Sequence, residues 1–396
     1  MAASAQITHE DVAARVGEIV PTLRANALRA EREGRAPDEN MEALRDAGFL
    51  RLMAPKRYGG LEANWRSNIE SIAEVGRGCA STSWIAATGA AGQWILGCLP
   101  DEGQDEIFGD GPDVQSTCVL QFWSASARQD GDDWILNGKW PFSTGCLNHR
   151  WIGGGAIVGE GENGMPRVGY FVFPTAQARI EQTWHTTGMS GTGSNTVVAE
   201  DVRVPASRMI RLEDLITNNY LSKQNAGNLL WNTPASGVIF AGSLGTPIGV
   251  ARNAMEAFVD RLPGRAITYS QYTDQSAAPI THIELARAST LHHAAEALAA
   301  AVADTVDRKN ADGSKWSLQE RAQMRGDGAM VVDLARDAVQ VLFNNSGATG
   351  IQDDIVVQRC LRDINALSVH ALLHKNNNFE LYGRVMLGGD PMTPLL

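Results

Sequence analysis

The 396-residue sequence lacks the features of several large classes of protein. No apolar run approaches the roughly 20 residues of a membrane-spanning helix, so an integral membrane protein is not expected. The first residues carry neither the basic nor the apolar stretch of a secretory signal, which favours a cytoplasmic protein. Cations are also in deficit, because 34 Lys and Arg face 45 Asp and Glu, a formal net charge of −11. That balance argues against nucleic-acid and anionic-membrane partners, which both require clustered cations.

Cysteine is scarce, and no Cys-x-x-Cys motif occurs. An odd number of scattered thiols indicates neither a disulfide framework nor a zinc knuckle, so reduced cysteines are expected. The five are Cys79, Cys98, Cys118, Cys146 and Cys360. Internal repeats and flexible Gly/Ser-rich linkers are missing as well. With 44% hydrophobic and 20% charged residues, the composition is that of a globular protein of two or three domains or one composite core.

The pattern of apolar residues divides the chain into three zones. Residues 1–112 show helical spacing, and Ser81–Leu99 is almost entirely apolar, Gly and Ala, as in a buried helix. Residues 113–214 change to short alternating segments broken by glycines, including a strand that meets a tight turn at Asn137-Gly138. Residues 215–396 return to helical spacing with Ala-rich stretches, as helix bundles require. These zones predict a mostly α fold with a central β-domain.

Ordered motifs carry a family resemblance. A glycine-dense loop, Trp184–Ser194, runs into a short β-segment and leaves through Asp201-Val202-Arg203-Val204-Pro205. Asn137–Gly145 precedes this loop, and Gly347–Asp354 and Glu380–Arg384 follow it. In this order the motifs resemble the acyl-CoA dehydrogenase superfamily, and most of all its oxygenase branch, the group D flavin-dependent monooxygenases.

The resemblance implies an N-terminal helical domain, a middle β-barrel or sandwich and a C-terminal four-helix bundle. It also implies the oxygenase component of a two-component monooxygenase, a homotetramer that takes reduced flavin (FADH2 or FMNH2) from a separate NAD(P)H:flavin reductase. O2 then forms a C4a-hydroperoxyflavin, which inserts one oxygen atom into an aromatic or heteroaromatic substrate. An indole-like, polycyclic or phenolic compound fits that class, and an N- or S-oxygenating member of the same fold is an alternative.

One position separates this chain from the dehydrogenases of the superfamily. Their catalytic Tyr-Glu pair is replaced by His370-Ala371, and alanine cannot take a proton. A dehydrogenase or oxidase remains open only through a relocated base, for which Glu256 and Glu284 are the candidates. A third alternative is a non-catalytic assembly protein that has lost its chemistry.

The resemblance also implies catalytic roles. Thr144 is the hydroxyl expected to face the flavin, with Ser143 as its neighbour and substitute, although a Ser or Thr often only caps a turn. His370 is the expected acid–base or peroxide-stabilising group, because its ordinary pKa near 6.5 suits either direction of proton transfer. A metal pair with His374, four residues on, lacks a third ligand, so no metal is expected.

Further residues are expected around the cofactor and the substrate. The expected cofactor-binding residues are Phe142, Thr144, Trp184, Gly191, Thr192, Gly193, Ser194, Arg265, Gly347 and Gln352, with Gly347–Gln352 reaching a neighbouring subunit's flavin. The expected substrate-binding residues are Gly92, Phe122, Trp123 and Trp231, although large aromatics are more often core. Gly92 stands where phenol-oxidising members often carry a histidine, which makes an indole, a polycyclic compound or a heteroatom comparable substrates to a phenol.

Overall fold

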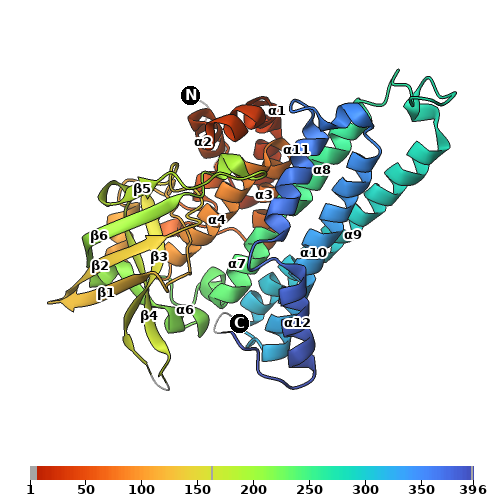
Figure 1. Ribbon diagram of the computed structural model, residues 1–396. Coiled ribbons are helices and arrows are strands. Elements are labelled where there is room, and N and C mark those ends of the chain that lie inside the picture. Colours follow the sequence, from red (N-terminus) through yellow and green to blue (C-terminus); the bar gives the residue numbers. More distant parts are fainter. Residues whose placement is uncertain (1–6, 162–163, 394–395) are drawn as a thin grey trace.

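The computed structural model describes residues 7–161, 164–393 and 396 (Figure 1). Residues 1–6, on which the prediction of no secretory signal rests, lie outside the described residues. Helices come first, then strands, then helices again, which confirms the expected fold class. Whether 1–112, 113–214 and 215–396 are separate domains stays a prediction. Within the described part of the chain, no helix has the length and apolarity needed to cross a membrane.

Five helices form the first zone: α1 (His9–Glu33), α2 (Asp38–Asp46), α3 (Trp65–Gly78), α4 (Ala80–Leu96) and α5 (Asp101–Phe108). A capping box starts α1, because Asp11 Oδ2 accepts the backbone N–H of Thr8 at 3.0 Å. The expected buried helix is α4, which is buried along almost its whole length. Its small residues let neighbours approach closely. A Cβ added to Gly92 would lie 2.4 Å from the carbonyl oxygen of Ser116.

Seven strands form one sheet: β1 (Ala125–Asp130), β2 (Asp133–Trp140), β3 (Trp151–Glu160), β4 (Pro166–Pro174), β5 (Arg179–Glu181), β6 (Thr196–Pro205) and β7 (Met209–Arg211). Their order is β5-β6-β2-β1-β3-β4-β7, and only β1 and β3 pair in parallel. The turn predicted at Asn137-Gly138 is wrong. Strand β2 continues through both residues, because β6 pairs with it on either side of a bulge and Asp201 donates its N–H to Asn137 Oδ1 at 2.8 Å.

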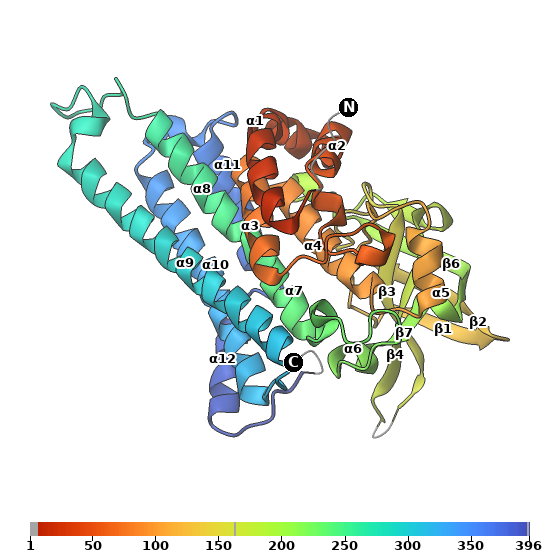
Figure 2. The same ribbon diagram turned by 180° about the vertical axis from the view of Figure 1, so that it is seen from behind.

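The last zone holds α6 (Leu212–Ile216), α7 (Ala235–Ser243), α8 (Gly245–Asp260), α9 (Pro279–Asp312), α10 (Leu318–Asn344), α11 (Val356–Ser368) and α12 (Lys375–Met386). Helices α8, α9, α10 and α11 lie alongside one another, away from the sheet (Figure 2). Glycine permits the close crossing of α8 with α3, because a Cβ at Gly249 would lie 2.1 Å from the Ala73 carbonyl oxygen.

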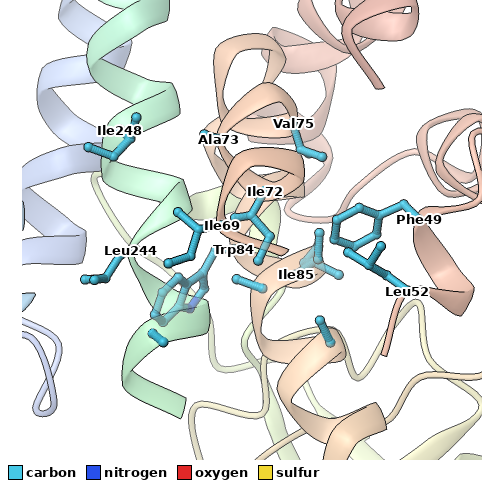
Figure 3. Packing of buried hydrophobic residues seen from close by; sticks show 14 of the residues in the cluster. Phe49, Leu52, Ile69, Ile72, Ala73, Val75, Trp84, Ile85, Leu244 and Ile248 are labelled. Atoms are coloured by element: carbon cyan, nitrogen blue, oxygen red, sulfur yellow. The ribbon is translucent and has the colours of Figure 1, made fainter. Parts of the chain in front are cut away.

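One large hydrophobic core joins the first and last helical zones, and a smaller one fills the β-domain. Figure 3 shows the large core where α3 and α4 meet the helices around Leu244, with Trp84 and Ile72 among its members. Trp84, near the start of α4, packs in this core between the first and last helical zones. All five cysteines are free, and four of them are buried.

Candidate active site

The turn after β2 exposes an aromatic ring in a strained backbone. Phe142 has φ +59°, a conformation that costs a non-glycine residue about 1–3 kcal/mol, and 70% of its side chain is exposed. Ser143 holds the turn, because its N–H donates to the Asn195 carbonyl at 3.1 Å and its Oγ to the Trp140 carbonyl at 2.8 Å. The Trp184 ring meets Phe142 edge-on at 5.8 Å. The Ser143 hydroxyl therefore donates its hydrogen within the turn, and the catalytic role predicted for this residue stays a prediction.

A row of hydroxyls lies behind this aromatic pair. Thr144 Oγ1 is 2.8 Å from Ser194 Oγ, which is 2.8 Å from Thr192 Oγ1. Thr192 Oγ1 donates to the carbonyl oxygen of Met189, also at 2.8 Å. All three hydroxyl side chains are buried. The structure therefore joins three residues that the sequence indicated separately.

The glycine loop is shaped by packing against the N-terminal helices. A Cβ at Gly191 would lie 2.9 Å from the backbone of Ala30 in α1, and Gly193 has φ +52° with the Gly34 carbonyl oxygen 2.8 Å from its Cβ position. Asn195 Oδ1 accepts the N–H groups of Thr183 and Trp184 at 2.9 and 3.0 Å. These contacts account for the glycines, and their predicted contact with a cofactor stays a prediction.

His370 approaches from the other helical zone. It lies two residues beyond the end of α11, and its ring centroid is 5.2 Å from that of Trp84, with the planes at 70°. Although part of the ring reaches solvent, surrounding protein lowers the pKa of His370 to about 4 by desolvation. The imidazole is therefore neutral at pH 7.

The histidine pair suggested by sequence spacing does not share a helical face. Helix α11 ends at Ser368, and His374 is the residue before α12, so an irregular turn separates the two histidines. Among the described residues, no group of three or more His, Cys, Asp or Glu is arranged to hold a metal ion.

A small apolar cavity of about 20 Å³ lies near His370. Leu372 lines this cavity, and its backbone N–H donates to His370 Nδ1 at 3.4 Å. The other lining residues are Leu120, Leu212, Ile216, Ala235, Ile239, Phe240 and Arg325. A space of this volume holds about one water molecule, so a ring-sized ligand does not fit it in this conformation.

Two predicted substrate residues lie elsewhere. Trp231 donates its indole N–H to the Trp94 carbonyl at 3.0 Å and packs against Gly97, so it fills the core at the opposite end of α4 from Trp84. That end is about 20 Å away by helix rise, so Trp231 does not lie beside Trp84 and His370, and its contact with a substrate stays a prediction. Gly92 faces Ser116 at a distance that leaves no room for a side chain, so it borders the core and no open pocket.

The other predicted aromatic pair lies in the α5–β1 connection. The rings of Phe122 and Trp123 are 4.5 Å apart. Phe122 is buried, whereas 67% of Trp123 is exposed. Neither lines the cavity beside Leu372. Their contact with a substrate stays a prediction.

The remaining predicted cofactor residues form a second cluster at adjoining ends of α8 and α10. Arg265 donates to the Ser346 carbonyl and, at 3.2 Å, to Thr349 Oγ1. Gly347 has φ +63°, and a Cβ there would lie 2.7 Å from Arg265 Nη2. Gln352 follows on the surface. This cluster is not joined to the hydroxyl row within the chain, and its predicted contact with a neighbouring subunit's flavin stays a prediction.

Two buried groups near the row were missed from the sequence. Asp363 of α11 accepts the Met189 N–H at 2.6 Å, and burial raises the pKa of this carboxyl to about 6. His149, four residues past Gly145, is buried, and desolvation lowers its pKa to about 4. No local sequence pattern identifies either group, because the burial of each depends on segments distant in the chain.

The relocated bases considered for a dehydrogenase are engaged elsewhere. Partial burial raises the pKa of Glu256, but hydrogen bonds from Arg24 and Arg77 lower it more, so the pKa lies below its ordinary value. Glu284 lies on α9, 3.7 Å from Arg287. A carboxylate held by two guanidinium groups is a poor proton acceptor, so Glu256 does not support thioester dehydrogenation.

The residues present fit a flavin. The exposed Phe142 and the half-buried Trp184 offer an apolar wall to a flat ring system, and Thr144 follows Phe142 by two residues. Both amide atoms of Gln115 and Nε2 of His149 are buried without a hydrogen-bond partner. A flavin carries ring N–H and C=O groups, which could form hydrogen bonds with these buried atoms.

Comparisons with known proteins agree with this geometry. Residues 8–106 match the family model "Acyl-CoA dehydrogenase, N-terminal domain", and residues 243–375 match "Acyl-CoA dehydrogenase, C-terminal domain". The chain is 30% identical to a flavin-dependent monooxygenase, oxygenase subunit HsaA, of Rhodococcus jostii, covering 93% of this chain and 96% of that one. It is 29% identical to an FADH(2)-dependent resorcinol hydroxylase, oxygenase component, of a Rhizobium species, covering 97% and 95%. The crystal structure of XiaF from a Streptomyces species, in complex with FADH2 and glycerol, superposes with a TM-score of 0.89 at 28% identity, over 98% of both chains.

Proposed function

Since this chain belongs to the oxygenase components of flavin-dependent monooxygenases with the acyl-CoA dehydrogenase fold, we propose how its own residues serve that chemistry. The protein takes FADH2 or FMNH2 from a separate NAD(P)H:flavin reductase and uses O2 to oxygenate an aromatic or heteroaromatic compound. When bound, the reduced flavin supplies the electrons that activate O2. The observation that carries the proposal is the row of hydroxyls that ends at Thr144, near Trp184 and the exposed Phe142.

Each group has a defined task. Phe142 and Trp184 wall the flavin ring, and Thr144 accepts or donates one hydrogen bond at its edge. His370, packed on Trp84, excludes water from the opposite side and exchanges a proton with the substrate or with reduced oxygen. Because its pKa is about 4, the imidazole is neutral at pH 7 and has one ring nitrogen that donates and one that accepts a hydrogen bond.

We place the substrate against the apolar residues around Leu372, where the cavity of about 20 Å³ has to widen to admit a ring. We favour an indole-like or polycyclic compound over a small phenol, because Gly92 carries no base and has no room for one. The relatives include a resorcinol hydroxylase, so a phenol remains the competing substrate in the test. Oxygenation at nitrogen or sulfur would appear as the same mass gain.

The test supplies chemically reduced FAD or FMN, without a reductase, together with ¹⁸O2 and either an indole panel or a phenol panel. We expect products that gain one ¹⁸O atom, mostly from the indole panel. Preference for small phenols would contradict the substrate proposal. Oxidation of a thioester by oxidised flavin under argon would contradict the monooxygenase itself, and Glu256→Gln would then be tested for loss of that activity.

We further propose that the protein is a cytoplasmic homotetramer. The long helix α9 exposes apolar side chains near its start, with 50% of Ile280 and 62% of Ile283 accessible, as expected of a surface that meets another subunit. Light scattering of the purified protein should give four times the 42.6 kDa chain mass. A monomeric mass would contradict this assembly and the predicted role of Gly347–Gln352 toward a neighbouring subunit.

A further inference from the structure

The glycine loop of the β-domain is held by α11 of the C-terminal zone. Arg362 Nη1 donates to the Thr187 carbonyl at 2.8 Å, and Asp363 Oδ1 accepts the Met189 N–H at 2.6 Å. Between them, a Cβ on Gly188 would lie 2.2 Å from the Arg362 carbonyl oxygen. The loop backbone therefore lies directly against this helix. A change in α11 is transmitted to the peptide of Met189.

Met189 is a junction of several hydrogen bonds. Its backbone is in the left-handed region with φ +55°, which a non-glycine residue adopts only when its surroundings enforce it. Its carbonyl oxygen accepts from Thr192 Oγ1 at 2.8 Å, from Trp184 Nε1 at 3.0 Å and from the Thr192 N–H at 3.1 Å. Asp363 thus holds the N–H of Met189, and the carbonyl of the same residue, in the next peptide group, accepts from both the Trp184 ring and the hydroxyl row.

The Met189 carbonyl also determines which hydroxyl donates and which accepts in each hydrogen bond of the row. A hydroxyl has one hydrogen, and a carbonyl can only accept, so Thr192 donates its hydrogen to Met189. Ser194 must then donate to Thr192, and Thr144 must donate to Ser194. Thr144 Oγ1 is left with lone pairs alone. Any further partner of Thr144 has to be a hydrogen-bond donor.

We propose that this one-way row makes the site selective for the reduced form of the flavin, with Asp363, Thr192 and Ser194 as positioning residues that act through Thr144. The inference rests on the proposed function. Reduction places a hydrogen on N5 of the flavin ring, whereas N5 of the oxidised ring carries only a lone pair. An acceptor held at Thr144 stabilises the first form and opposes the second.

The experiment compares the dissociation constants of reduced flavin, measured anaerobically, and of oxidised flavin. The wild-type protein should bind the reduced form at least about tenfold more tightly, the value of one hydrogen bond. Thr192→Val and Ser194→Ala each free a hydrogen for Thr144 to donate, so the ratio should fall about tenfold. The midpoint potential of the bound flavin should fall by about 30 mV with it. Ser190→Ala is the matched control in the same loop, because its hydroxyl donates to the Thr186 carbonyl at 2.8 Å, outside the row.

A merely structural role gives a different result, because a loosened loop would weaken both redox forms alike and leave their ratio unchanged. That outcome would overturn the proposal while the function stands. Asp363→Asn keeps an oxygen that can accept the Met189 N–H and should retain the ratio, whereas Asp363→Ala should lose it. Should Asp363→Ala fail to fold, Thr192→Val decides the matter. Failure of the wild-type protein to bind flavin in either form would instead overturn the proposed function.

Discussion

The imidazole of His370 meets the indole of Trp84 edge to face, with ring centroids 5.2 Å apart. The two residues come from different helical zones, since Trp84 lies on α4 and His370 follows α11. Their contact joins the turn after α11 to the buried helix α4. In the proposed function, this imidazole limits the access of water to the site.

Removal of this ring should expose the site to water. We expect His370→Ala to change the rate at which bound reduced flavin is reoxidised by O2 by tenfold or more, toward faster reoxidation with more H2O2, since positioned acid–base groups contribute about 10²–10⁴-fold. Stopped-flow absorbance measures this without a substrate. Because the pKa of His370 is about 4, the wild-type rate should show no step assignable to this residue between pH 6 and 8. A step near pH 6.5 that His370→Ala abolishes would contradict the lowered pKa.

Phe142 should lower the stability of the flavin-free protein and strengthen flavin binding. Phe142→Gly relieves a positive φ and is expected to leave the melting temperature of the flavin-free protein unchanged or slightly higher. The same change removes the exposed ring and should weaken flavin binding about tenfold. Met392→Gly is the matched control, because Met392 is also an exposed apolar residue at positive φ, +55°, and belongs to none of the predicted cofactor contacts. Equal flavin affinity in the two variants would show that Phe142 does not contact the cofactor.

Gly92 should tolerate no side chain. Gly92→Ala brings a Cβ within 2.4 Å of the Ser116 carbonyl oxygen, and such overpacking costs roughly 1–3 kcal/mol of unfolding free energy. Gly383→Ala on α12 meets nothing within 4 Å and should stabilise the protein by up to about 1 kcal/mol through helix propensity. Chemical denaturation of both variants measures the difference. A Gly92→Ala protein as stable as wild type would reopen this position to a substrate-contacting side chain.

The burial of Asp363 should appear in the pH dependence of stability. Desolvation raises the pKa of its carboxyl to about 6, against the opposing effects of the Met189 N–H, Arg362 and Arg359, and with a small further increase from Glu31. The native carboxyl therefore binds more protons than the unfolded one between about pH 4 and 6, so its contribution to stability falls as the pH rises through 6.

Asp363→Asn removes this titration. From pH 5 to 8, the unfolding free energy of the wild-type protein should fall by about 1.4 kcal/mol relative to that of Asp363→Asn, one pH unit of differential proton binding. Denaturation at both pH values gives the difference, and Asp132→Asn, at an exposed carboxylate, should show none. A wild-type protein that gains stability relative to Asp363→Asn over this range would show that the native carboxyl has a lowered pKa.

Several elements were predictable because they depend on local pattern. The apolar, Gly- and Ala-rich run near Ser81–Leu99 is α4, and the strands near Trp151, Val168 and Thr196 are β3, β4 and β6. The turn at Asn137-Gly138 was mispredicted, because pairing with β6 overrides the local preference for a hairpin. The shared face of His370 and His374 failed for a similar reason, since α11 ends before either residue.

By itself, the sequence determined the class of the protein: the alternation of helical and strand patterns, the order of the glycine-rich motifs and the loss of the dehydrogenase base at Ala371. These features can be read from the order of residues alone, because they do not depend on contacts between distant segments. Only the tertiary structure decided which groups meet. Asp363 and Met189 are 174 residues apart, and Thr144 and Ser194 are 50 apart. Hydrogen-bond direction and burial arise from contacts between distant segments, so no local pattern contains them.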